Sequence, residues 1–215
     1  MSSPTTPASI GPGEFFPVVG VGPHEKPWPE GEQYDPELLL NGDRRNVLDH
    51  YRYWTVEAIV KDLNTKRHKL QIAIENWQHD LNIGSIVRTA NAFNVSGVHI
   101  VGKRDWNKRG AMVTDRYLTV MHHPTIQDFA AYCKEQNLPI IGIDNVPGSK
   151  QLEPAVLPES CVLLFGQEGA GMSDEGIAVC EVLYEINQYG STRSMNASAA
   201  GAIAMYHWAL QHLPK

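Results

Sequence analysis

The chain has 215 residues, which is enough for one domain with a full hydrophobic core and a tight length for two. Hydrophobic residues make up 42% and charged residues 20%, and no apolar run reaches the ~20 residues of a membrane span, so we expect no membrane segment. The formal net charge of −6 argues against a uniformly basic nucleic-acid-binding protein.

The amino-terminal sequence has neither the basic start nor the apolar middle of a secretion signal. The three cysteines, Cys133, Cys161 and Cys180, form no CxxC pair and are odd in number, which is typical of reduced thiols. We therefore expect a cytoplasmic protein.

Proline and glycine dominate the chain up to about residue 33. Such a segment forms neither a helix nor a central strand, so we expect residues 1–33 to be an extended or disordered tail. Helical spacing follows within 43–64, and it predicts an amino-terminal helical extension over 34–68. The residues that carry this spacing are Leu48, Tyr51, Thr55, Ile59 and Leu63.

Strands and helices alternate from residue 69 onward. Strands are expected at 69–75, 97–102, 138–144, 161–166 and 182–188, and helices at 82–95, 125–137, 173–180 and 195–212. Thr125 can cap the amino end of the second of these helices. Nearly all-apolar strands that alternate with helices predict one α/β domain over 69–215 with a mostly parallel sheet.

Polar residues follow several of the predicted strands. They include Asn76, Asn145, the loop GQEGAG at 166–171 and the segment YGSTRSMN at 189–196. Ligands bind at the carboxyl ends of the strands in such sheets, so these residues indicate a site for a polar ligand. The loop GQEGAG does not match GxGxxG, and the chain lacks GxxxxGK[ST], which argues against a dinucleotide-binding turn and a P-loop.

The start of the last helix consists almost entirely of small and hydroxylated residues, STRSMNASAAG at 191–201. Small side chains at a helix start predict that a ligand or another segment approaches the backbone closely. A small-residue helix interface would give the same pattern.

The basic residues gather in the middle of the chain. Residues 51–150 hold 13 basic and 9 acidic side chains, a surplus of four, whereas the flanking segments are acidic. A local patch is sufficient for phosphate binding, although a solvated loop surface explains the cluster equally well. The candidate RNA-binding residues are Lys103, Arg104, Lys108, Arg109 and Arg116, with a second basic cluster at 61–69 and Trp106 as a candidate for stacking on a base.

Three blocks in a fixed order resemble one family. The first block, ENWQHDLNIGSIVRTANAFNVSGVHIVG, ends at Gly102, and the others are VLLFGQEGAGMSDE at 162–175 and EINQYGSTRSMNASAAGAIAMY at 185–206. They resemble motifs 1, 2 and 3 of the SpoU (TrmH-like) RNA 2′-O-ribose methyltransferases of the SPOUT superfamily. The resemblance covers roughly residues 70–212, and three blocks in order are specific where one would be weak.

The resemblance implies an α/β fold whose carboxyl-terminal part threads a deep trefoil knot, and a homodimer as the active form. It also implies S-adenosylmethionine as the cofactor and a ribose 2′-hydroxyl of tRNA or rRNA as the methyl acceptor. Two alternatives stay open: a non-catalytic RNA-binding dimer that retains the fold, and a nucleotide-dependent enzyme such as a dehydrogenase. Retention of the five polar motif positions argues against the first, and the missing GxGxxG argues against the second.

The resemblance assigns site residues one by one. The implied catalytic residues are Asn82, Arg88, Glu168, Ser194 and Asn196, and the implied cofactor contacts are Ile143, Gly166, Ile186 and Met195. The apolar neighbours of Arg88 predict a position near the edge of the core. Because an arginine keeps its proton, with a pKa above ~12, we expect Arg88 to hold phosphate and to stabilise the attacking oxygen. No metal is expected, since the methyl donor is already activated.

Overall fold

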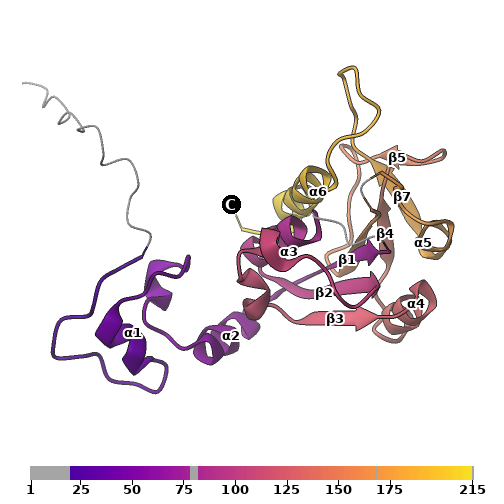
Figure 1. Cartoon of the computed structure of the whole chain (residues 1–215). Coiled ribbons are helices and arrows are strands. Elements are labelled where there is room, and N and C mark those ends of the chain that lie inside the picture. Colours follow the sequence, from indigo (N-terminus) through magenta and orange to yellow (C-terminus); the bar gives the residue numbers. More distant parts are fainter. Residues whose placement is uncertain (1–19, 78–81, 168, 215) are drawn as a thin grey trace, which may run out of the picture. The chain divides into compact units, whose positions relative to one another are not determined.

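The computed structural model describes residues 20–77, 82–167 and 169–214 (Figure 1). The chain divides into two compact units, residues 1–61 and residues 62–215. The sequence placed boundaries at 33/34 and 68/69 instead. The described part of the expected tail, residues 20–33, belongs to the same unit as the helices that follow it.

The smaller unit contains the helix α1 (Pro36–Asn41), the 3₁₀ turn η1 (Asp49–Tyr51) and most of α2 (Val56–Asn64). Its first described residues are extended and paired with later ones, because Val21 forms an antiparallel bridge with Asp43. The helical spacing read from Leu48 onward gives a regular α-helix only from Val56. The chain is interrupted before that point by Tyr53, whose φ of 64° lies in the left-handed region.

Asp43 organises the turn that precedes α2. Its buried carboxylate accepts hydrogen bonds from Arg45 Nε (2.9 Å) and Nη2 (2.7 Å), and from the backbone N–H groups of Arg45 and Tyr53 (both 3.0 Å). Burial alone would raise the pKa of Asp43, but these hydrogen bonds outweigh it and lower the pKa to about 2. The hydrogen bonds of the Asp43 carboxylate therefore keep the segment 43–53 out of a regular α-helix.

The larger unit has a seven-stranded sheet in which every pair is parallel, in the order β3-β2-β1-β6-β4-β7-β5. The strands are β1 (His68–Asn76), β2 (Val95–Gly102), β3 (Val120–His123), β4 (Ile140–Ile143), β5 (Lys150–Gln151), β6 (Cys161–Phe165) and β7 (Val182–Glu185). The helices are α3 (Asn82–Ala92), α4 (Ile126–Glu135), α5 (Asp174–Val179) and α6 (Ala197–His212), with the 3₁₀ turns η2 (Lys108–Ala111) and η3 (Thr114–Tyr117). The predicted α/β class with a mostly parallel sheet is confirmed.

Helices cover both faces of this sheet (Figure 1). Ile86 of α3 and Trp208 of α6 belong to one buried cluster, whereas Phe129 of α4 and Met172 before α5 belong to the other. The central strands β1 and β6 contribute side chains to both clusters, which explains why their sequences are nearly all apolar. Thr125 caps α4 as predicted, since its hydroxyl accepts a hydrogen bond from Asp128 N (3.1 Å).

Candidate functional site

A pocket of about 410 Å³ lies at the carboxyl ends of β4, β6 and β7. This volume falls within the ~300–1,000 Å³ of pockets that hold small ligands and cofactors. The residues predicted as cofactor contacts, Ile143, Gly166, Ile186 and Met195, all line it. Their contact with a cofactor stays a prediction, but the fold brings all four together, three from the ends of β4, β6 and β7 and Met195 from the segment before α6.

The motif 2 loop after β6 folds back on itself. Gln167 and Gly171 exchange two backbone hydrogen bonds (3.0 and 2.9 Å). A Cβ at Gly166 would lie 2.2 Å from Met172 N, so only glycine fits there. Gly169 and Gly171 are explained instead by their φ angles of 88° and 72°, which lie in the left-handed region. The predicted catalytic Glu168 lies outside the described residues.

Sequence reasoning missed a buried carboxylate at the end of β1. Glu75 is fully buried and accepts hydrogen bonds from Ser173 N (2.8 Å) and Ser173 Oγ (2.5 Å). Burial raises the pKa of Glu75. Ser173 is also the N-cap of α5, so Glu75 of motif 1 anchors the end of motif 2. The available signal was an acidic residue directly after the apolar run at 72–74.

Asp144, directly after β4, was missed as well. Its Oδ2 accepts a hydrogen bond from Met172 N (2.7 Å), so it fixes the end of the motif 2 loop. Asp144 and the half-buried Glu185 both line the pocket. Two carboxylates beside apolar walls suit a ligand that carries positive charge together with an apolar part. S-adenosylmethionine is such a ligand, with a sulfonium, an ammonium group and an adenine ring.

Motifs 1 and 3 meet through two asparagines. Asn196 Nδ2 donates a hydrogen bond to Asn82 Oδ1 (2.8 Å). Asn196 Oδ1 accepts from the backbone N–H groups of Ser198 (3.0 Å) and Ala199 (3.3 Å), which makes Asn196 the N-cap of α6. One side chain thus starts the last helix and ties it to the start of α3. Asn196 and Ser194 both line the pocket.

Arg88 does not line the pocket and is exposed, so its predicted place near the edge of the core is wrong. It lies on α3 between the buried Val87 and the half-buried Thr89, in the second turn after Asn82. The structure gives its guanidinium no hydrogen bond or ion pair with another described residue. An exposed cation near the asparagine pair is available to an incoming anionic substrate.

The small residues at 191–201 have more than one explanation. Ala197 and Ala200 line the pocket, as a close ligand approach predicts. Gly201 packs against Ile86, where an added Cβ would make an ordinary contact of 3.4 Å. Ser191 and Ala199 are exposed, so packing within the described chain does not explain their size.

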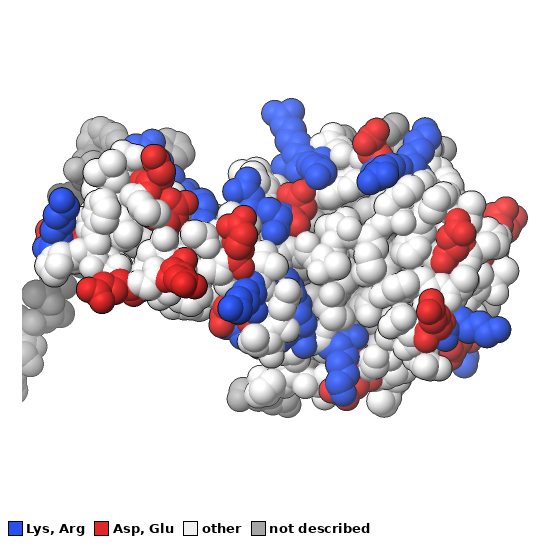
Figure 2. Space-filling view, turned by 90° about the horizontal axis from the view of Figure 1, so that it is seen from below, with Lys and Arg blue, Asp and Glu red and all other residues white. Residues whose placement is uncertain are grey.

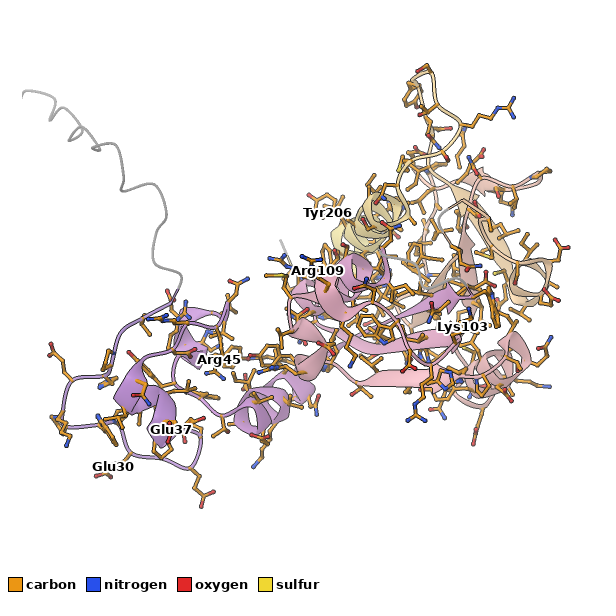
Figure 3. The ribbon with its side chains drawn as sticks, in the orientation of Figure 1. Glu30, Glu37, Arg45, Lys103, Arg109 and Tyr206 are labelled. Carbon is orange, nitrogen blue, oxygen red and sulfur yellow. The ribbon has the colours of Figure 1, made fainter. Side chains whose placement is uncertain are left out.

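The five candidate RNA-binding cations, Lys103, Arg104, Lys108, Arg109 and Arg116, are all exposed. Figure 3 shows Arg109 beside α3 and Lys103 well apart from it. Lys108 pairs with Asp115 (3.1 Å) and lies 5.5 Å from the centre of the Trp106 ring. Trp106 itself packs partly against the core, so its ring is not a free stacking surface.

The second basic cluster is engaged in structural contacts. Arg67 donates hydrogen bonds to Asn94 Oδ1 (2.9 Å) and to the Tyr117 carbonyl (2.5 Å), while Lys69 pairs with Glu159 (3.0 Å). On the face seen in Figure 2, basic and acidic side chains are interspersed without a continuous basic field. The segment 103–116 is therefore the stronger RNA-binding candidate.

The described ranges hold neither a metal-binding cluster nor a membrane-spanning helix. Residues 20–77, 82–167 and 169–214 contain no group of three or more His, Cys, Asp or Glu placed to hold a metal ion. None of the helices in those ranges has the length and apolar character that crossing a membrane requires.

Comparison with known proteins agrees with this geometry. The model of the SpoU rRNA Methylase family matches residues 69–206. A tRNA (guanosine(18)-2′-O)-methyltransferase of Borreliella burgdorferi is 26% identical over 151 residues, which cover 69% of this chain and 69% of the relative. The enzyme of the same name from Escherichia coli K12 is 29% identical over 154 residues, or 69% of this chain and 66% of the relative.

Solved structures show the same fold. The A. aeolicus TrmH/SpoU tRNA modifying enzyme superposes with a TM-score of 0.63 and 23% identity, over 73% of this chain and 83% of that protein. The SpoU methyltransferase AviRb from Streptomyces viridochromogenes, in complex with AdoMet, gives a TM-score of 0.61 and 22% identity. The match covers 70% of this chain and 60% of that protein. The family model covers well over half of the chain and includes the pocket, the asparagine pair and Arg88. The chain belongs to the SpoU rRNA methylase family, as its three motifs predicted.

Proposed function

We propose that this chain is an S-adenosylmethionine-dependent methyltransferase that methylates a ribose 2′-hydroxyl of tRNA. The two bacterial relatives carry the name of that reaction on tRNA, and a structural neighbour holds the cofactor. The observation that carries most weight is the hydrogen bond between Asn196 and Asn82 beside the pocket, because it assembles motifs 1 and 3 into one site. Family, pocket and motif residues together favour catalysis over an RNA-binding dimer that only retains the fold.

The pocket suits the proposed cofactor chemically. Ile143, Ile186 and Met195 offer apolar surface for the adenine ring, and Asp144 and Glu185 offer carboxylates to the positive groups. When bound, S-adenosylmethionine supplies a methyl group that its sulfonium already activates. The remaining task for the protein is to place a ribose 2′-hydroxyl in line with that methyl group and to stabilise the oxygen as it loses its proton.

Arg88 is the residue we assign to the acceptor side. A guanidinium with a pKa above ~12 does not remove a proton, but it binds phosphate through paired N–H donors. The exposed position of Arg88 on α3 leaves it available to the phosphate next to the methylated ribose. Ser194 and Asn196 then orient the motif 3 loop, and Glu168 is assigned to the same site through its motif alone.

We infer further that the carboxyl-terminal part threads a deep trefoil knot and that the active form is a homodimer. The family resemblance implies both. Support for the dimer comes from α6, where Ile203, Tyr206 and Leu210 are 42%, 57% and 50% exposed. Their spacing of three and four residues puts them on one face, opposite the buried Trp208 and its neighbours. An apolar stripe of this kind is typical of a protein–protein contact.

RNA would be held mainly by the exposed cations of the segment 103–116, since each Lys or Arg that meets a phosphate releases counterions. A tRNA substrate and reduced cysteines favour a cytoplasmic location. The three thiols are free, and burial raises the pKa of each to about 12, so they stay protonated at neutral pH.

Methyl transfer from labelled S-adenosylmethionine to total tRNA and to total rRNA tests this function directly. We expect label in tRNA, and nucleoside analysis should recover it as a 2′-O-methylnucleoside. Label on a base, label in rRNA alone, or no transfer to either RNA would contradict the proposal.

A further inference from the structure

The segment between β7 and α6 projects from the body of the larger unit (Figure 1). Residues 189–193 join Gln188 to Ser194, and both of these residues line the pocket. Because neighbouring Cα atoms are about 3.8 Å apart, Tyr189 and Arg193 lie at the mouth of the pocket.

The base of this loop is tied down while its tip is free. Gln188 Nε2 donates a hydrogen bond to the Arg193 carbonyl (3.2 Å), and Asn145 Nδ2 donates to the same carbonyl. The Glu153 carboxylate accepts from Asn187 N (3.0 Å) and Asn187 Nδ2 (3.2 Å). The loop is therefore closed at its base and anchored to the segments that follow β4 and β5, so little ordering is required when it meets a partner.

The loop carries one exposed aromatic ring and one exposed cation. Tyr189 is 92% exposed, the largest exposed fraction among the large hydrophobic side chains described. Arg193 is exposed as well. Residues 186–215 contain Arg193 and Lys215 but no Asp or Glu, so nothing in this part of the sequence repels phosphate.

We propose that Tyr189 is a stacking platform for an unpaired nucleobase of the substrate RNA, with Arg193 on an adjacent phosphate. The inference rests on the proposed function and narrows its substrate class. In a regular RNA duplex the bases are stacked on each other, whereas nucleotides in loops can be splayed out onto aromatic rings. The enzyme then selects a nucleotide in a loop or single strand, because the base of such a nucleotide can unstack from its neighbours.

The test uses the full-length protein and three variants of the loop, Tyr189→Ala, Tyr189→Phe and Arg193→Ala. Val156→Ala is the matched control, because Val156 is an apolar side chain that is 84% exposed and does not line the pocket. The probes are unmodified tRNA transcripts, and one RNA oligonucleotide used single-stranded and annealed to its complement. Binding is measured without cofactor, and methyl transfer and cofactor affinity are measured separately.

We expect Tyr189→Ala to weaken binding of tRNA and of the single strand about tenfold, which is the size of one base-stacking contact. The KM of this variant for RNA should rise by a similar factor, while its affinity for S-adenosylmethionine stays unchanged. Tyr189→Phe keeps the ring and should bind within about twofold of wild type. Arg193→Ala should reduce the salt dependence of binding. Tyr189→Ala and the wild type should bind duplex RNA with equal affinity.

Three results would overturn the inference: wild-type RNA affinity of Tyr189→Ala, an equal loss on the duplex, or a Tyr189→Ala protein that dissociates into monomers. The last result would place the ring against a second copy of the chain. The proposed function fails on a different observation, a wild-type protein that transfers no methyl group to RNA. Binding measured without cofactor still tests Tyr189 in that case, and a wild-type protein without affinity for RNA overturns both.

Discussion

At the scale of single residues, Asn196 shows how one side chain links fold and site. Its Oδ1 accepts two backbone N–H groups at the start of α6, and its Nδ2 donates to Asn82. The motif predicted Asn196 as a site residue, but its position one residue before the helix start was not read from the sequence. The amide is required because it combines an acceptor and a donor, which neither aspartate nor serine does in the same way.

Replacement of Asn196 by alanine and by aspartate separates these two tasks. Asn196→Ala should lower stability by about 1 kcal/mol through the lost N-cap. Asn196→Asp keeps the capping acceptor and complements the helix dipole, so it should retain most of the stability. Both variants should lose activity because neither donates to Asn82. Thermal unfolding and methyl transfer measure the two effects. An active Asn196→Asp enzyme would show that the Asn82 contact is dispensable.

Arg88 should be essential for transfer and nearly irrelevant to cofactor binding, since it is exposed and does not line the pocket. Arg88→Ala should abolish methyl transfer and leave the Kd for S-adenosylmethionine within about twofold. Arg88→Lys should be severely impaired too, because an ammonium group cannot reproduce the paired donors of a guanidinium. Calorimetric titration and a transfer assay check both claims. Near-normal turnover of Arg88→Ala would remove it from the site.

At the scale of elements, the segment 103–116 is locked against motif 1. Asn76 Nδ2 donates hydrogen bonds to the carbonyls of Lys103 (2.7 Å) and Asp105 (2.9 Å), which fixes the start of the segment. Further along, the backbones of α3 and η2 touch. A Cβ at Gly84 would lie 2.7 Å from Ala111 N and 2.8 Å from Gly110 Cα. The exposed cations are therefore held at a fixed place relative to Arg88.

Gly84→Ala should disturb this contact, because backbone atoms on both sides cannot move aside as a flexible side chain would. We expect a loss of about 1–3 kcal/mol in unfolding free energy, together with weaker RNA binding. Gly190→Ala is the control for stability, since an added Cβ there meets no atom within 4 Å. Chemical denaturation of both variants measures the difference. Equal stability of the two would show that the α3–η2 contact is loose.

The hydrogen bonds of the Asp43 carboxylate stabilise the smaller unit, and this stabilisation should change with pH in a predictable direction. The folded pKa of about 2 lies below the reference value of 3.8. The stabilisation is therefore fully present above about pH 4 and is lost as the pH falls toward 2. Its size is on the order of 2 kcal/mol, from about 1.4 kcal/mol per pKa unit.

Hydrogen exchange at the amides of Arg45 and Tyr53 measures this effect, since both donate to Asp43. We expect Asp43→Asn to lose protection there at pH 5 relative to wild type. The difference between the two proteins should shrink as the pH approaches 2. A difference that does not depend on pH would exclude the charge of Asp43 as its cause.

Most helices and strands of the larger unit were predictable from its sequence. Buried central strands such as β6 have continuous apolar runs, and α4 carries its own capping residue, so local patterns sufficed. The strand β3 (VMHH) was missed because an edge strand of four residues has no long apolar run. The helical spacing was misleading only before Val56, because the hydrogen bonds of Asp43 hold the segment 43–53 in turns. Such tertiary contacts leave no periodic pattern.

At the scale of the whole molecule, the pocket gathers residues from strand ends far apart in the chain. The motifs named its apolar contacts, because Ile143 and Ile186 directly end or follow β4 and β7. They did not name Glu75 or Asp144, whose role is to hold one loop against another. A carboxylate that binds backbone N–H groups across the fold is recognisable only once the partner segment is in place.

The apolar character of α6 is the last feature that a single chain leaves unexplained. A helix that is apolar nearly all round is expected to be buried on both sides. Ala204, Met205 and Trp208 face the core, whereas Ile203, Tyr206 and Leu210 are exposed (Figure 3 labels Tyr206). Two copies that meet through this stripe would bury it, as the proposed homodimer requires.

Leu210→Glu should therefore convert the protein into a monomer, because a charge buried against an apolar partner is costly. Methyl transfer should fall with dimer content, and a sample diluted through the dissociation range should lose activity in parallel. Val156→Glu adds the same charge at a side chain that is 84% exposed and outside α6, and it should leave both mass and activity unchanged. Light scattering gives the mass, and the transfer assay gives the activity. A Leu210→Glu protein that keeps the wild-type mass would move the subunit contact away from α6, and a fully active monomer would show that one chain builds the whole site.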